Sequence, residues 1–121
     1  MKKILIADDS LFMRKILRDI LSKDYEIVEA DTGKKALKQF KKEKPDLTLL
    51  DIIMPESEEE GLRVLKEIKK NDSRACVVMV TAVGQIVITE ECKKLGAKDV
   101  ITKPFEEKEI LEIVEKYLSS V

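Results

Sequence analysis

An aspartate stands at the end of an apolar run in two places in this chain. Asp51 follows the run Leu47–Leu50, and the pair Asp8-Asp9 follows the run Ile4–Ala7. A short apolar run indicates a buried strand, and in an open parallel sheet ligands bind at the carboxyl ends of the strands. We therefore expect three carboxylates to meet at one edge of a sheet. They repel one another unless a cation lies among them, and a site made only of oxygen ligands suits Mg²⁺.

Two further polar side chains follow the later apolar runs. Thr81 comes after Cys76–Val80, and Lys103 comes just after Val100–Ile101. In isolation, an aspartate or threonine at a strand end is most often a cap or turn residue, and an exposed lysine has no special role. Together with the aspartates, these side chains supply a nucleophile, a metal site, a hydroxyl donor and a cation. That set suits phosphoryl transfer, in which Asp51 as the nucleophile forms an acyl phosphate.

Strand-like runs alternate with helical patterns along the chain, and this alternation predicts a parallel sheet with right-handed crossovers and helices on both faces. The first, third and fourth runs are almost continuously apolar, which is typical of central strands covered on both sides. The second run is flanked by charged residues and is expected at an edge. The strand-like runs are Ile4–Ala7, Glu26–Glu29, Leu47–Leu50, Cys76–Val80 and Val100–Ile101.

The helical patterns repeat apolar residues three or four positions apart. The first helix has Ser10 as its N-cap, the second starts near Thr32 and ends before Pro45, and the fourth runs from about Gln85 to Leu95. The apolar positions predicted for the buried faces are Phe12, Met13, Ile16, Leu17, Ile20 and Leu21 in the first helix, Ala36, Leu37 and Phe40 in the second, Leu62, Leu65 and Ile68 in the third, and Ile110, Leu111, Val114, Tyr117 and Leu118 in the fifth.

Length and composition favour a single globular domain over residues 1–121, with 44% hydrophobic residues to form its core. The net charge of −1 gives no general attraction to nucleic acid or to an acidic membrane surface. The apolar stretches are too short to span a bilayer or to form a signal peptide, so we expect a cytoplasmic protein. Cys76 and Cys92 have no metal-like spacing and are expected to be core or near-core thiols. The absence of histidine excludes a histidine base or zinc ligand.

The polar residues at the strand ends resemble the motif of the response-regulator receiver family. The resemblance runs from about residue 2 to residue 119 and implies a doubly wound α/β fold of the flavodoxin and CheY type. This fold has a five-stranded parallel sheet of order 2-1-3-4-5 with five helices, and the family is itself a known example of that order. The matching residues are Asp8-Asp9, Asp51 with Met54-Pro55, Thr81-Ala82 and Lys103-Pro104-Phe105.

The resemblance implies a metal site and a phosphorylation site. Asp51 would accept a phosphoryl group from a histidine kinase. Mg²⁺ would be bound by Asp9, Asp51 and the backbone carbonyl of Ile53, while Asp8 would help through a water molecule.

The other motif residues would act on the phosphoryl group. Lys103 would contact a phosphate oxygen, with a cis peptide bond before Pro104. Thr81 would bind the phosphoryl group and move towards it on activation. The protein would catalyse only its own phosphorylation and dephosphorylation, so it is not expected to be an enzyme acting on other substrates.

We expect no effector domain after the fifth helix, so the resemblance is to monomeric, stand-alone receivers of the CheY type. The partner is expected on the face of helix four, strand five and helix five. The chain departs from the family in three places. Val100 replaces the usual aromatic residue. The loop Glu56–Glu60 is two residues longer than usual. It is most simply a solvated, mobile turn, although its charge would also suit a basic partner. Ile53 and Val83 are apolar where polar residues often tune phosphate lifetime.

Three other functions fit parts of the pattern. A phosphorelay intermediate would pass the phosphoryl group on to a histidine phosphotransfer protein. A small aspartate-nucleophile phosphatase would carry Asp-x-Asp on its first strand and a cap domain, whereas here Asp8 and Asp9 are adjacent. A scaffold that never uses phosphate would not need the complete set of site residues, and this chain has all of them.

Overall fold

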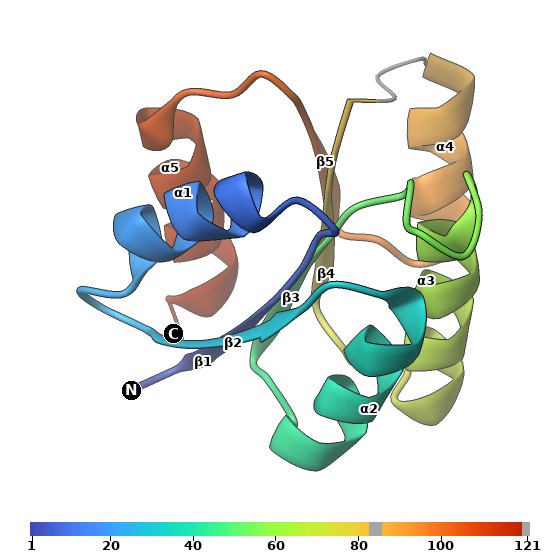
Figure 1. Cartoon of the computed structure of the whole chain (residues 1–121), viewed down its shortest axis with the longest axis horizontal. Coiled ribbons are helices and arrows are strands. Elements are labelled where there is room, and N and C mark those ends of the chain that lie inside the picture. Colours follow the sequence, from blue (N-terminus) through green and yellow to red (C-terminus); the bar gives the residue numbers. More distant parts are fainter. Residues whose placement is uncertain (83–85, 120–121) are drawn as a thin grey trace.

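The computed structural model describes residues 1–82 and 86–119 and places a parallel sheet between two layers of helices (Figure 1). The strands lie in the order β2-β1-β3-β4-β5, and all neighbouring strands are parallel, as predicted from the sequence. The elements are β1 (Lys3–Ala7), α1 (Leu11–Leu21), β2 (Glu26–Ala30), α2 (Gly33–Glu43), β3 (Leu47–Leu50), α3 (Glu60–Asn71), β4 (Val77–Thr81), α4 (Ile86–Lys94), β5 (Asp99–Thr102) and α5 (Glu107–Leu118).

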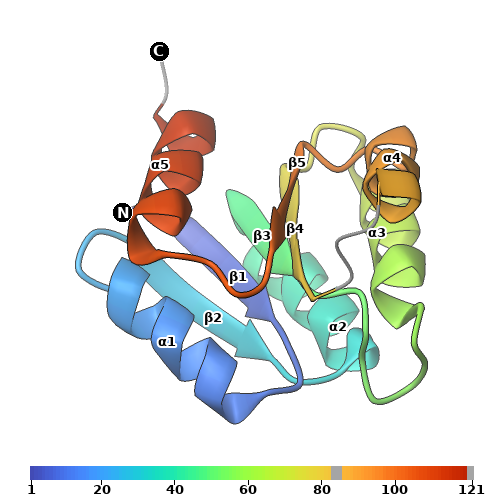
Figure 2. The same cartoon turned by 90° about the horizontal axis from the view of Figure 1, so that it is seen from above.

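The two faces of the sheet are covered by different helices. Helices α1 and α5 lie on one face, and α2, α3 and α4 lie on the other (Figures 1 and 2). Because side chains alternate between the faces of a strand, Ile4 and Ile6 of β1 belong to the core beneath α1 and α5, while Leu5 and Ala7 belong to the core beneath α2, α3 and α4. Every residue of β3 and β4 is buried, whereas most of β2 is partly exposed. The prediction that β2 lies at an edge is therefore confirmed.

The predicted caps of the first two helices are confirmed. The Ser10 hydroxyl accepts a hydrogen bond from the Met13 N–H at 3.1 Å, and the Thr32 hydroxyl accepts one from the Lys35 N–H at 3.0 Å. These side chains satisfy backbone donors that the first turn of a helix leaves unpaired. The described part of α4 begins at Ile86, so the predicted start at Gln85 lies outside the described residues.

The predicted buried faces are correct at their centres and wrong at some margins. Leu17 and Leu21 of α1 are buried, whereas Phe12 is 72% exposed, because it lies 140° around the helix from Leu17 at 100° per residue. Leu111 is 38% exposed at the edge of the buried stripe of α5. Leu62 is only partly buried.

Both cysteines are free thiols, and the expectation of core or near-core positions is confirmed. Cys92 is buried and Cys76 is partly buried, and burial raises the pKa of both thiols. None of the described helices combines the length and the apolar character that crossing a membrane requires.

Candidate functional site

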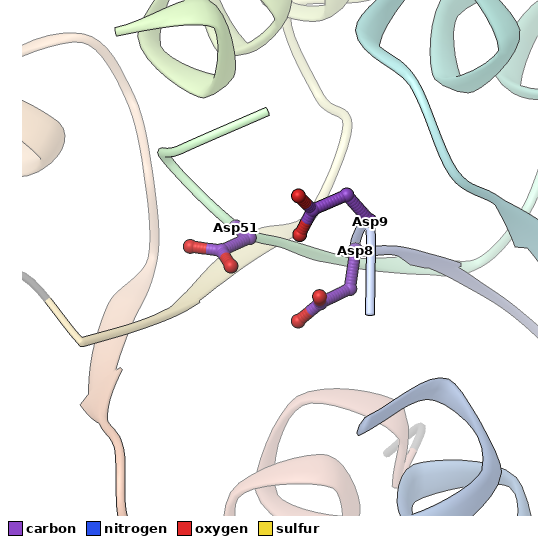
Figure 3. A group of neighbouring side chains, drawn as sticks. All are labelled: Asp8, Asp9 and Asp51. Atoms are coloured by element: carbon purple, nitrogen blue, oxygen red, sulfur yellow. The ribbon is translucent and has the colours of Figure 1, made fainter. Parts of the chain in front are cut away.

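The register of β1 and β3 brings the predicted aspartates together. Ala7 of β1 lies beside Leu50 of β3, and the Asp51 N–H donates to the Ala7 carbonyl at 3.0 Å. Asp8 and Asp51 therefore leave the sheet at the same edge, one residue after these partners. Figure 3 shows their carboxylates gathered with that of Asp9 at this edge. One carboxylate oxygen from each of the three residues lies within 4.8 Å of the others.

Lys103 joins two of these aspartates. Its Nζ donates to Asp8 Oδ2 at 2.7 Å and to Asp51 Oδ2 at 2.9 Å. The three side chains are only 16%, 3% and 8% exposed for Lys103, Asp8 and Asp51 respectively. Lys103 follows β5, its N–H donates to the Thr81 carbonyl at 2.8 Å, and the peptide bond before Pro104 is cis. The strand ends therefore place a cation against two buried carboxylates.

The pKa shifts in this cluster follow from burial and ion pairing. Burial raises the pKa of Asp8, and the hydrogen bonds from Lys103 and from the Ser10 N–H only partly oppose this effect. Burial alone would lower the pKa of Lys103, but its hydrogen bonds to Asp8 and Asp51 outweigh burial and raise it. Lys103 is thus held in its charged form and neutralises part of the negative charge at the edge of the sheet.

Most of the acidic oxygens have fixed partners. Asp51 Oδ1 accepts a hydrogen bond from the Ile52 N–H at 2.7 Å, and Asp8 Oδ1 accepts one from the Ser10 N–H at 2.9 Å. Asp9 is exposed, and within the described residues its carboxylate accepts no hydrogen bond. Asp9 is therefore the carboxylate that can turn towards a cation with the least loss of existing contacts. A cluster of three carboxylates gives the hard oxygen ligands that Mg²⁺ prefers.

The remaining predicted residues lie around this cluster. Thr81 is the last residue of β4 and its side chain is fully buried, so it belongs to the strand that it was predicted to follow. Ile53 lies two residues after Asp51 and is 41% exposed. Val100 lies in β5 and packs, partly buried, against the core beneath α2, α3 and α4. Val83, predicted to affect phosphate lifetime, lies outside the described residues.

Arg14 is a structural support of the site that the sequence analysis did not identify. Its Nη1 donates to the Asp8 carbonyl at 2.7 Å, and its Nε donates to Glu29 Oε1 at 2.9 Å. Arg14 therefore joins the loop after β1 to a side chain of β2. Its place in the first turns of α1, soon after the acidic pair, is the only signal of this role in the sequence.

The interpretation of Glu56–Glu60 as a solvated turn is wrong for Glu60, whereas Glu56 is exposed but has fixed hydrogen-bond partners. Glu60 is 6% exposed, and its carboxylate accepts hydrogen bonds from Arg63 Nε at 2.8 Å and Nη2 at 2.7 Å. The Glu56 carboxylate accepts from the backbone N–H groups of Gly33 at 3.0 Å and Lys34 at 2.9 Å. Buried Glu60 requires a partner such as Arg63 because desolvation of an unpaired carboxylate is costly.

A doubly wound sheet with an acidic cluster and a lysine at its carboxyl edge defines a class of α/β proteins that bind ligands at this edge. Residues 4–115 match the family model of the response regulator receiver domain. The chain belongs to this family.

The relatives of the chain include proteins of the CheY type. It is 43% identical over 119 residues to the chemotaxis protein CheY of Bacillus subtilis (strain 168), with 97% of this chain and 98% of that protein covered. It is 39% identical over 118 residues to sporulation initiation phosphotransferase F of the same organism, with coverage of 97% and 94%. Among solved structures it resembles the CheX–CheY–BeF₃–Mg complex from Borrelia burgdorferi, with a TM-score of 0.89, 33% identity and coverage of 95% and 87%. The chain is thus a receiver domain of the CheY type.

Proposed function

We propose that this protein is a stand-alone, cytoplasmic response regulator that accepts a phosphoryl group on Asp51 from a histidine kinase and thereby changes its affinity for a signalling or motility partner. The observation that carries the proposal is the placement of Asp51, buried and held at both carboxylate oxygens, beside Asp8, Asp9 and Lys103. An Asp51 oxygen would attack the phosphorus of a phosphohistidine. A P–O bond forms as the P–N bond breaks, and the imidazole nitrogen keeps the electron pair and takes up a proton.

The proposed metal ligands are carboxylate oxygens of Asp9 and Asp51 with the backbone carbonyl of Ile53, while Asp8 acts through water. The all-oxygen chemistry of the cluster fits Mg²⁺. When bound, Mg²⁺ supplies positive charge that offsets the repulsion between the carboxylates and an incoming phosphoryl group. Lys103 supplies a second positive charge, already directed at Asp51. Thr81, at the end of the neighbouring strand, would hold a phosphoryl oxygen.

The start of α1 suits docking of a phosphoryl donor. Leu11 and Phe12 are each 72% exposed, and they follow Asp9 by only two and three residues. An exposed apolar pair beside the acceptor gives a kinase domain a surface to cover. The downstream partner is proposed to bind the face of α4, β5 and α5, where Ile86, Val87 and Leu111 are exposed.

The test is labelling with acetyl phosphate and Mg²⁺, followed by intact mass spectrometry. The parent protein should gain one phosphoryl group, Asp51→Asn should gain none, and chelation of the metal should abolish labelling. Asp24→Asn, which changes an exposed carboxylate outside the cluster, should label like the parent. Unchanged labelling of Asp51→Asn would refute the assignment of the acceptor. Because Asp9 is proposed to bind Mg²⁺ directly and Asp8 only through water, Asp9→Ala should weaken Mg²⁺ binding more than Asp8→Ala.

A second candidate function is that of a relay intermediate, which is favoured by the similarity to sporulation initiation phosphotransferase F. Both functions use Asp51, and they differ in what happens to the phosphoryl group afterwards. Rapid back-transfer from phosphorylated protein to a histidine phosphotransfer protein would support the relay. Hydrolysis of the phosphorylated protein without transfer would favour the stand-alone regulator.

A further inference from the structure

The segment between β3 and α3 carries the Ile53 carbonyl, and its conformation therefore sets one side of the proposed metal site. The segment is folded back on itself, because Met54 and Ser57 exchange backbone hydrogen bonds of 3.1 and 3.2 Å. At its far end the Gly61 N–H donates to the Ile52 carbonyl at 2.7 Å. These bonds shape the segment internally, but they do not join it to the side of the site that carries Asp8 and Asp9.

The Glu56 carboxylate provides that connection. Its Oε1 accepts from the Gly33 N–H at 3.0 Å and its Oε2 accepts from the Lys34 N–H at 2.9 Å, both in the first turn of α2. The Thr32 hydroxyl takes only the Lys35 N–H, and the first turn of α2 has no acidic residue of its own. Glu56 therefore supplies both the missing acceptors and the negative charge that a helix N-terminus favours.

The electrostatics agree with this geometry. The slight desolvation of Glu56, an exposed residue, acts to raise the pKa of its carboxyl, but the backbone hydrogen bonds from Gly33 and Lys34 outweigh it and lower the pKa. Glu56 is thus ionised at neutral pH, and both of its oxygens are engaged.

The N-terminus of α2 is in turn joined to the other side of the site. Helix α2 starts three residues after Ala30, whose carbonyl accepts a hydrogen bond of 3.0 Å from the Asp8 N–H. A continuous series of contacts therefore runs from Asp8 through Ala30 and the start of α2 to Glu56, and from there along three residues of backbone to Ile53. The two sides of the proposed metal site, already joined at Asp8 and Asp51 by the β1–β3 pairing and by Lys103, thus have a further connection through one side chain outside the site.

We propose that Glu56 is a positioning residue that joins the Ile53 segment to the N-terminus of α2 and so sets the metal-site geometry before the ion binds. This inference rests on the proposed function, since it assumes that Asp9, Asp51 and the Ile53 carbonyl bind Mg²⁺. Glu56 does not itself contact the metal. Its loss would leave the ligands present but let the Ile53 carbonyl move relative to Asp9.

The chain offers two matched controls. Glu58 is an exposed carboxylate of the same segment that forms no hydrogen bond within the described residues, so Glu58→Ala removes the same charge and keeps the connection. Thr32→Ala removes a cap from the same helix and leaves the Glu56 contacts in place. Both Thr32→Ala and Glu56→Ala should lower the melting temperature of the metal-free protein by about 4 °C, as expected for the loss of a helix cap.

The decisive measurement is the Mg²⁺ dissociation constant of the full chain, obtained by calorimetric titration of metal-free protein with MgCl₂. Changing a residue that orients metal ligands from outside typically weakens binding by at least about tenfold, and we expect that loss for Glu56→Ala. Glu58→Ala and Thr32→Ala should stay within about twofold of the parent, because neither one frees the Ile53 segment. Glu56→Gln, which keeps one oxygen acceptor, should fall between the parent and Glu56→Ala.

Equal dissociation constants for Glu56→Ala and Glu58→Ala would overturn the inference, as would equal weakening by Thr32→Ala. In either case Asp9→Ala should still weaken Mg²⁺ binding more than Asp8→Ala, and the proposed function would stand. If the parent chain binds no Mg²⁺ under these conditions, the proposed function fails and the role of Glu56 fails with it.

Discussion

Lys103 is held between two buried carboxylates, and its replacement by methionine should destabilise the metal-free protein. The substitution keeps most of the side-chain volume but removes the hydrogen bonds of 2.7 Å to Asp8 and 2.9 Å to Asp51. Removing one partner of a buried ion pair costs roughly 3–5 kcal/mol, because the charge that remains is uncompensated. Since the Lys103 side chain is still 16% exposed, we expect a loss near the lower end, about 3 kcal/mol at pH 7.

The loss should depend on pH in a defined direction. The pKa of Asp8 is raised from its ordinary value of 3.8, mainly by burial, so ionised Asp8 destabilises the fold at neutral pH. A raised carboxyl pKa gives stability that is complete below 3.8 and is lost as the pH rises through the value in the folded protein. Lys103 opposes this rise, so Lys103→Met should raise the pKa of Asp8 further. The variant should therefore recover part of its lost stability as the pH falls from 7 towards about 4.

Mg²⁺ should also reduce the difference between the variant and the parent. A unit charge and a divalent ion about 5 Å apart repel by roughly 1–2 kcal/mol even with screening close to that of water. Without Lys103, Mg²⁺ should therefore bind about tenfold more tightly, which at saturation returns about 1.4 kcal/mol of the lost stability.

Urea denaturation followed by far-ultraviolet circular dichroism would measure these effects, with and without EDTA. A loss of about 3 kcal/mol should lower the urea midpoint by more than about 1 M. Lys15→Met is a matched control, because Lys15 pairs with Asp19 at the surface and its side chain is 69% exposed. That variant should lose less than about 0.5 kcal/mol. If Lys103→Met in EDTA is as stable as the parent, or if its loss is the same at acidic pH, the ion pairs do not have the role described.

The other predictions concern the surroundings of Asp51 and the output face. Ile53→Asn should speed loss of the phosphoryl group, because a polar side chain can orient the attacking water whereas isoleucine excludes it; a decay rate equal to the parent's, measured by mass spectrometry, would contradict this. Gly61→Ala should destabilise the protein by about 3 kcal/mol in thermal unfolding, since an added Cβ would collide with the Asp51 carbonyl and the Ile52 Cα, and parent-like stability would show that the turn can adjust. After activation with beryllofluoride, the Val100→Ala variant should bind its partner as the activated parent protein does, because a β-branched strand residue has too few rotamers to act as a switch. Lost binding with an intact fold would show that Val100 transmits the signal.

The positions of the site residues could be predicted from the sequence because each one ends a strand. The rule that parallel strands present their carboxyl ends at one edge turns a local pattern into a spatial cluster, and it needs no knowledge of side-chain packing. It placed Asp8, Asp51 and Lys103 together across separations of 43 to 95 residues. The rule does not determine which carboxylate oxygen accepts each hydrogen bond, since this depends on the loops after the strands.

The acidic run between β3 and α3 shows where local patterns stop being informative. Consecutive glutamates indicate a solvated turn in any sequence reading, and Glu58 and Glu59 do lie exposed. Glu56 is also exposed, but its carboxylate accepts hydrogen bonds from the first turn of α2, more than 20 residues earlier in the chain. Glu60 is buried beside Gly33 of the same turn and pairs with Arg63.

Gly33 contributes to the placement of both Glu56 and Glu60. A Cβ at this position would collide with the Glu60 side chain, so the absence of a side chain creates the space in which Glu60 is buried and paired with Arg63. The Gly33 N–H meanwhile donates to Glu56. One residue that the sequence analysis passed over as the start of a helix thus orders the segment beside Asp51. A larger residue at position 33 should disturb the Ile53 side of the site without changing any residue of the motif.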